Sequence, residues 1–197
     1  MHSDVTLRDT IIFSQIKEML GHIAFDGVLV SCGTCRESLQ ELGAEEIFGC
    51  GLADIGFFVL EHSPEQFSQD KARHFLYHAP CHDSLQGEGP MLVRRIGGQV
   101  TSVGGCCSEA GTLALSRPDI ACAMLKRKRD YLQAQASTDQ QHTVVTNCPS
   151  CISGLGRNRE LGYTPQHLAV LLAETIGGDG WATEFHELVQ QAELVTF

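Results

Sequence analysis

The amino-acid sequence predicts an α/β fold made of two pseudo-repeated, cysteine-rich units with short, mainly parallel sheets, the first unit being incomplete. Two observations lead to this prediction. Short apolar runs that suit strands alternate with stretches whose apolar residues recur at helical spacing, an arrangement that favours a parallel sheet covered by helices. A C-x-x-C segment also occurs twice, each time directly after an apolar run.

The first half of the chain contains one predicted strand between helical segments. The apolar run GVLVS has the length and composition of a buried strand. Apolar residues before and after it recur at the three- and four-residue spacing of a helix. We therefore predict a strand at 27–31, helices at 8–20, 37–43 and around 52–61, and a short segment, EIFG, at 46–49.

The second half repeats this scheme with more strands. Pro118 suits the first turn of a helix, which we expect to run to about Gln133. The polar, turn-rich stretch at 61–73 divides the chain into residues 1–62, the C-terminal part of a first repeat, and residues 63–197, a complete second repeat. The predicted strands are 75–79, 99–103 and 143–147, a last helix lies within 164–178, and an exposed loop is expected at 135–141.

The two C-x-x-C segments belong to an internal repeat. When Cys32 is aligned with Cys148, Cys35 falls on Cys151, and both copies then run into an apolar helix. The copies are unequal, because three further cysteines precede the second C-x-x-C and none precedes the first. We expect the chain to begin inside its first repeat, as a fragment, a split gene product or a subunit.

Charge and hydropathy exclude several classes of partner. The 197 residues carry a formal net charge of −10, and such an acidic surface repels phosphate backbones, so nucleic acid is not an expected partner. The apolar stretch LADIGFFVLE is too short to span a bilayer, and the first residues lack the basic and apolar regions of a signal peptide. We therefore expect a cytoplasmic protein without a transmembrane segment.

The nine cysteines carry the functional signal. Their number is odd and two of them are adjacent, which fits metal or redox chemistry better than a disulfide framework. Five thiols of the second repeat each follow a predicted strand, and the ends of parallel strands meet at one edge of a sheet. Five thiols exceed the four ligands of one zinc ion, whereas soft thiolates in that number suit iron and sulfide. These five are Cys81, Cys106, Cys107, Cys148 and Cys151.

Three motifs carry a resemblance to a known family. The segments HAPCHDS, GGCCSEAG and NCPSCISG resemble the cysteine-rich CCG domain found in a subunit of heterodisulfide reductase, in the iron–sulfur subunit of glycolate oxidase and in related lactate-utilisation proteins. HAPCHDSLQGEG with CCSEAGTLALSRPDI looks more closely like the C-terminal region of large bacterial FAD-linked oxidases. The resemblance covers about residues 27–176.

The resemblance implies an iron–sulfur cluster of the [4Fe–4S] type. The five cysteines of the second repeat match the family's complete ligand motif, whereas Cys32 and Cys35 match only the C-x-x-C end of the other one and are further candidate metal ligands. The chain would be an electron-transfer component of an oxidoreductase, not a complete enzyme. It would be paired with a FAD-linked dehydrogenase for 2-hydroxy acids such as glycolate or lactate, with FAD on a partner or a missing region, and with a redox partner.

Two other functions remain open from the residues. The thiols could hold zinc in a structural or partner-binding module, or Cys32 and Cys35 could act directly in a thiol–disulfide reductase component of the heterodisulfide type. Beside Cys81, His78 and His82 could donate to a cluster sulfur, replace a ligand or be satisfied by the backbone.

Three further features have simpler interpretations. Cys50 and Cys122 are expected to be packing thiols. The basic run KRKR at 126–129 is expected to form a solvated helix face, with a docking patch for an acidic redox partner as the alternative.

Overall fold

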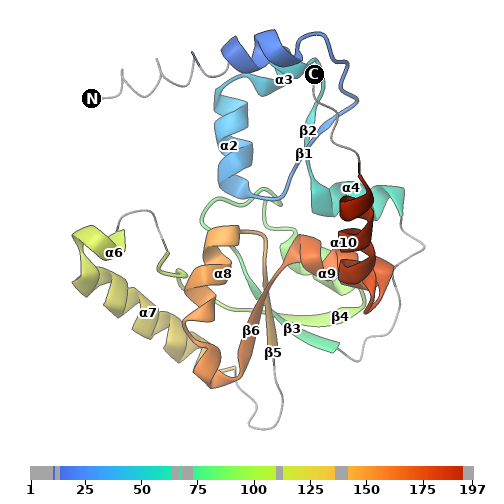
Figure 1. Ribbon diagram of the computed structural model, residues 1–197. Helices are drawn as coiled ribbons and strands as arrows, with labels where there is room; N and C mark the ends of the chain where they lie inside the picture. The colour runs from blue at the N-terminus through green and yellow to red at the C-terminus, as the bar shows by residue number, and fades with distance from the viewer. Residues whose placement is uncertain are drawn as a thin grey trace.

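The computed structural model describes residues 11, 14–63, 67, 73–109, 113–135 and 142–192. It confirms the α/β class, because helices alternate with strands and the strand pairs of its two short sheets are parallel (Figure 1). The start of the helix predicted at 8–20, much of the stretch at 61–73 and nearly all of the loop predicted at 135–141 lie outside the described residues.

The smaller sheet contains two strands from the first half of the chain. Strand β1 (Val28–Val30) pairs in parallel with β2 (Leu52–Asp54). Helices α2 (Gly33–Glu41) and α3 (Ala44–Phe48) connect the two strands, and α4 (Ile55–His62) follows β2 without a loop. In Figure 1 this part of the chain, in blue and cyan, lies above the larger sheet.

The larger sheet contains four parallel strands in the order β4-β3-β5-β6. Its strands are β3 (Arg73–His78), β4 (Gly98–Ser102), β5 (His142–Thr146) and β6 (Tyr163–His167). The connecting and following helices are α5 (Gly89–Arg95), α6 (Leu113–Ser116), α7 (Pro118–Gln133), α8 (Pro149–Gly156), the 3-10 helix η2 (Arg159–Leu161), α9 (Leu168–Gly177) and α10 (Trp181–Gln191).

Helices cover both faces of the larger sheet. Because side chains alternate between the faces of a strand, Phe75 and Tyr77 of β3 pack on one face with α4, α5 and α9. Leu76, between them, packs on the opposite face with Leu132 of α7 and Leu155 of α8. The core therefore has two parts separated by the sheet, and α4 from the first half of the chain belongs to one of them.

The internal repeat reappears in three dimensions. In both halves a strand leads into a C-x-x-C segment at the start of a helix, and a later strand pairs in parallel with the first one. Thus β1, α2 and β2 correspond to β5, α8 and β6. Cys32 and Cys148 each precede a helix in the same extended conformation, with φ of −151° and −148°. Asp54 and His167 are equivalent too, since each side chain caps the helix that directly follows the second strand, α4 or α9.

Two strands were missing from the sequence prediction. Residues 52–54 form β2 and residues 163–167 form β6, although the apolar helix patterns predicted around 52–61 and within 164–178 include most of these residues. Both strands are short and run directly into a helix, so no turn residues separate the sequence pattern of the strand from that of the helix. Among the described helices, none has both the length and the apolar character needed to cross a membrane.

Candidate metal centre

The cysteines of the second repeat follow three adjacent strands of the larger sheet. Cys81 comes after β3, Cys106 and Cys107 after β4, and Cys148 after β5 with Cys151 in the first turn of α8. The next strand along the chain, β4, lies on one side of β3, whereas β5 lies on the other side, so the strand order reverses at β3. Open α/β sheets form their binding crevices at such a point, beyond the carboxyl ends of the strands. All five cysteines line one cavity of about 350 Å³. The predicted convergence of these side chains is therefore present in the structure.

The deepest part of the cavity contains Cys107 and Cys151. Both side chains are buried, and their sulfur atoms and a ring nitrogen of His78 lie within 4.8 Å of one another. Contact with Cys151 lowers the pKa of Cys107 to about 4, and His78 acts in the same direction. Contact with Cys107 raises the pKa of Cys151, as does burial. Their surroundings therefore favour ionisation of Cys107 and disfavour that of Cys151.

The outer part of the cavity contains Cys81, Cys106 and the half-buried Cys148. Burial raises the pKa of Cys81, and the neighbouring Cys106 raises it further. The Ser108 backbone N–H donates to the Cys106 sulfur at 3.4 Å. Ser108 itself adopts a left-handed conformation with φ of 69°, which is uncommon for a residue other than glycine.

The first C-x-x-C lies beside this cavity. Thr34, between Cys32 and Cys35, lines the cavity together with the five cysteines of the second repeat. Contact with Cys32 raises the pKa of Cys35, burial adds to this, and the charge of Cys148 acts in the same direction. The structure therefore brings Cys32 and Cys35 close to the second repeat, with Cys35 exposed.

A close backbone approach holds α2 in this position. A Cβ atom at Gly33 would lie 1.8 Å from the His82 carbonyl oxygen, so only glycine fits there. Two contacts reinforce the approach: the Arg36 guanidinium donates to the Ser84 carbonyl, and Glu37 forms an ion pair with the exposed His82. His82 is thus engaged with α2 in the first half of the chain.

Lys128 is the main functional candidate that sequence reasoning missed. It belongs to the KRKR run on α7, which the sequence predicted as a solvated face, yet its side chain is 0% exposed. Its ammonium group donates to His78 Nδ1 at 3.0 Å and to the Gly104 carbonyl at 2.9 Å, just before the vicinal cysteines. Burial lowers the pKa of Lys128 to about 8, and the thiolate of Cys107 opposes this shift.

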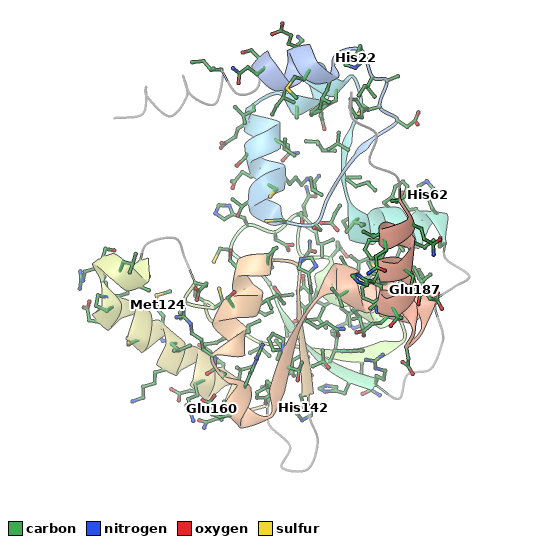
Figure 2. All side chains as sticks on the ribbon, viewed as in Figure 1. His22, His62, Met124, His142, Glu160 and Glu187 are labelled. Carbon is green, nitrogen blue, oxygen red and sulfur yellow. The ribbon has the colours of Figure 1, made fainter. Side chains whose placement is uncertain are left out.

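The two other basic residues next to Lys128 behave as predicted. Arg127 and Arg129 are exposed, and Arg129 pairs with Glu160 of η2 at 2.6 Å. Figure 2 shows Glu160 on the outside of the molecule. Lys128 differs because α7 packs on the larger sheet, and its apolar stripe includes Ala121 and Leu132 on either side of the lysine. Helical spacing places residues 121, 128 and 132 on one face, which is the signal that could have identified the buried lysine.

The two cysteines outside both motifs are not equivalent. Cys50 is half-buried, which agrees with a packing thiol. Cys122 is exposed on α7, so the prediction that it packs is wrong. The cause is helix geometry: its neighbour Ala121 occupies the buried face, and adjacent residues of a helix point in different directions.

The donor set and its surroundings fit a thiolate-bound iron–sulfur cluster. Five cysteine sulfur atoms surround one cavity, and this number exceeds the four ligands of a single zinc ion. Within the described residues, His78 Nε2 and Ser108 Oγ are buried and lack a hydrogen-bond partner. Buried polar atoms normally find partners, and cluster sulfur atoms are acceptors that such donors can use.

The fold and the site define an α/β protein with a cysteine-lined candidate metal centre at the carboxyl ends of a parallel sheet. Over 136 residues the sequence is 25% identical to one subunit of a fumarate reductase (CoM/CoB) from Methanothermobacter marburgensis, so its similarity is to part of an oxidoreductase. The aligned part covers 64% of this chain and 27% of that relative, so the chain spans about a quarter of the relative's length. No known protein-family profile matches the chain.

Among solved structures, glutamate racemase isoform RacE1 from Bacillus anthracis is similar to this chain. The similarity covers 96% of this chain and 67% of the racemase at 13% identity, with a TM-score of 0.40. A value this low does not define a shared fold.

Proposed function

We propose that the chain is an iron–sulfur electron-transfer component of an oxidoreductase. The observation that carries the proposal is the arrangement of five cysteines from three strand ends around one cavity. The proposed ligands are Cys81, Cys106, Cys107, Cys148 and Cys151. A bound cluster would accept an electron and pass it on, because iron and sulfide supply the redox chemistry.

The protein's own contribution is to bury and polarise this centre. Cys107 and Cys151 are buried against the sheet, whereas Cys81 is exposed. The proposed centre is thus covered on one side and accessible on the other, as an electron donor or acceptor requires. The N–H of Ser108, which donates to the Cys106 sulfur, belongs to the hydrogen bonds that tune reduction potential.

The finer proposal concerns type and partner. The motif resemblance supports a cluster of the [4Fe–4S] type and a FAD-linked dehydrogenase for 2-hydroxy acids as the electron donor. The similarity to a fumarate reductase subunit supports a role as a subunit of a larger oxidoreductase. We expect the flavin on another polypeptide or domain, and we expect a separate redox partner to take up the electrons.

Anaerobic purification tests the proposal directly. We expect brown protein with iron and acid-labile sulfide in similar molar amounts and a reducible signal in electron paramagnetic resonance. Colourless protein that binds no iron after anaerobic reconstitution with iron and sulfide would exclude the proposed function. Mixing the reconstituted protein with a FAD-linked 2-hydroxy-acid dehydrogenase then tests the partner by reduction of the centre.

A zinc site is the second candidate, because one observation favours it. His78, Cys107 and Cys151 offer three ligand atoms within 4.8 Å, and Cys148 beside Cys151 could be the fourth. Such a site needs neither Cys81 nor Cys106. Zinc binding that survives replacement of Cys81 by Ser supports this candidate, whereas loss of iron in the same variant supports the cluster.

A further inference from the structure

The buried lysine of α7 is anchored at the loop that carries the vicinal cysteines. Besides the 2.9 Å bond to the Gly104 carbonyl, the Lys128 ammonium group lies 3.4 Å from the carbonyl oxygens of Val103 and Gly105. Lysine is rarely buried without such partners. One side chain therefore fixes three consecutive carbonyl groups directly before Cys106.

The fourth partner of this lysine determines the tautomer of His78. An ammonium group has protons and no lone pair, so Lys128 donates and His78 Nδ1 accepts across 3.0 Å. In the neutral ring the remaining proton is then on Nε2. Nε2 is buried and has no hydrogen-bond partner in the described part of the chain, and the sulfurs of Cys107 and Cys151 are close to this ring.

We infer that Lys128 is a positioning residue that holds the Nε2–H of His78 toward the sulfur atoms of the metal centre. This inference rests on the proposed function and adds a means of setting the reduction potential. A hydrogen bond to a ligand sulfur and a buried positive charge both favour the more negative, reduced state of a centre. The lysine and the histidine together therefore raise the midpoint potential.

Lys128→Met tests the inference, because methionine keeps most of the buried side-chain volume and removes the charge and the donor. The matched control is Lys126→Met, an identical substitution at an exposed position of the same helix. In an anaerobic redox titration of the full chain, we expect Lys128→Met to reduce the equilibrium constant for reduction at least tenfold, a shift of about −59 mV for one electron. The control should match the wild type.

Substitutions of His78 provide a second, independent variant pair. His78→Leu removes the donor and should lower the midpoint potential. His78→Gln retains an N–H group, so its midpoint potential should fall less. Lys128→Met should have a smaller effect in the His78→Leu background than alone, because Lys128 acts partly through the histidine. A residue that only supported the fold would produce no such dependence.

The outcomes separate this inference from the proposed function. Absence of iron from the reconstituted wild-type protein overturns both. Wild-type iron content with equal midpoint potentials in Lys128→Met and Lys126→Met overturns the inference alone. If Lys128→Met loses its iron, the midpoint potentials of the two His78 variants test the inference instead. Equal potentials for the wild type, His78→Leu and His78→Gln then overturn it.

Discussion

The carboxylate of Asp54 lies 2.8 Å from the amide nitrogen of Asn147, across 93 positions of sequence. Asp54 ends β2 in the first half of the chain, and Asn147 directly precedes the cavity cysteine Cys148. Ser84 donates to the same carboxylate at 2.6 Å, and all three side chains are buried. This cluster joins the carboxyl ends of the two sheets next to the candidate metal centre.

Replacement of Asp54 by Ala should therefore destabilise the fold and the site together. The substitution leaves the Ser84 hydroxyl without its acceptor, removes one of the two acceptors of the Asn147 amide and removes the cap on the Gly56 N–H, so we expect a loss of about 3 kcal/mol in the free energy of unfolding. Denaturant titration measures this loss. The control is Asp26→Ala at an exposed position, and equal stability of the two variants would contradict the role of the cluster.

Two glycines of α8 should respond in opposite ways to alanine. A Cβ atom at Gly154 would lie 2.3 Å from the Cys107 carbonyl oxygen, whereas at Gly156 its nearest neighbour would be the Arg159 side chain at 3.6 Å. We expect Gly154→Ala to lower the free energy of unfolding by about 1–3 kcal/mol through overpacking and to displace Cys107. Gly156→Ala should leave the free energy of unfolding unchanged or raise it by up to about 1 kcal/mol, because alanine has the higher helix propensity. Thermal unfolding distinguishes the two, and similar curves would argue against this close approach.

The first C-x-x-C provides a test of the ligand set. Because the five cysteines of the second repeat line the cavity and the side chain of Cys35 is exposed, we expect the double substitution Cys32→Ser and Cys35→Ser to retain wild-type iron content. Iron and sulfide analysis after anaerobic reconstitution measures this, with Cys122→Ser as control. Loss of half the iron or more in the double variant would make the first pair part of the centre.

His167 should make stability depend on pH. Burial lowers the pKa of this ring, and its Nδ1 accepts a 3.1 Å hydrogen bond from the Ala169 N–H at the start of α9, which requires the unprotonated atom. Below about pH 6.5 the unfolded chain takes up a proton that the folded ring resists, so stability falls as pH falls through this window. His167→Asn keeps a capping oxygen and does not titrate. Its stability should therefore decline less than that of the wild type between about pH 7.5 and 5.5, and parallel declines would rule out this role.

The sequence was sufficient for the repeat and for the convergence of the cysteines. Both depend on local patterns: an apolar run predicts a strand, and the ends of parallel strands share one edge of a sheet. The position of Lys128 depended instead on which face of α7 packs on the sheet. Four consecutive basic residues resemble a solvated face, whereas burial of Lys128 is decided by partners contributed by β3 and the loop after β4.

Contacts between the two halves were also beyond sequence reasoning. Asp54 belonged to a predicted helix, and nothing local linked it to Ser84 or Asn147. The approach of Gly33 to the His82 carbonyl is equally non-local, and it is what places Thr34 on the wall of the cavity. Such pairings arise from packing between segments far apart in the chain, and local periodicity does not predict them.

The most direct measurement is the iron and acid-labile sulfide bound by five single Cys→Ser variants after identical anaerobic reconstitution. We expect substitutions at positions 81, 106, 107, 148 and 151 each to lower both contents well below the wild type, whereas Cys122→Ser should not. Undiminished iron and sulfide in variants of the buried pair, Cys107 and Cys151, would contradict a centre bound in this cavity.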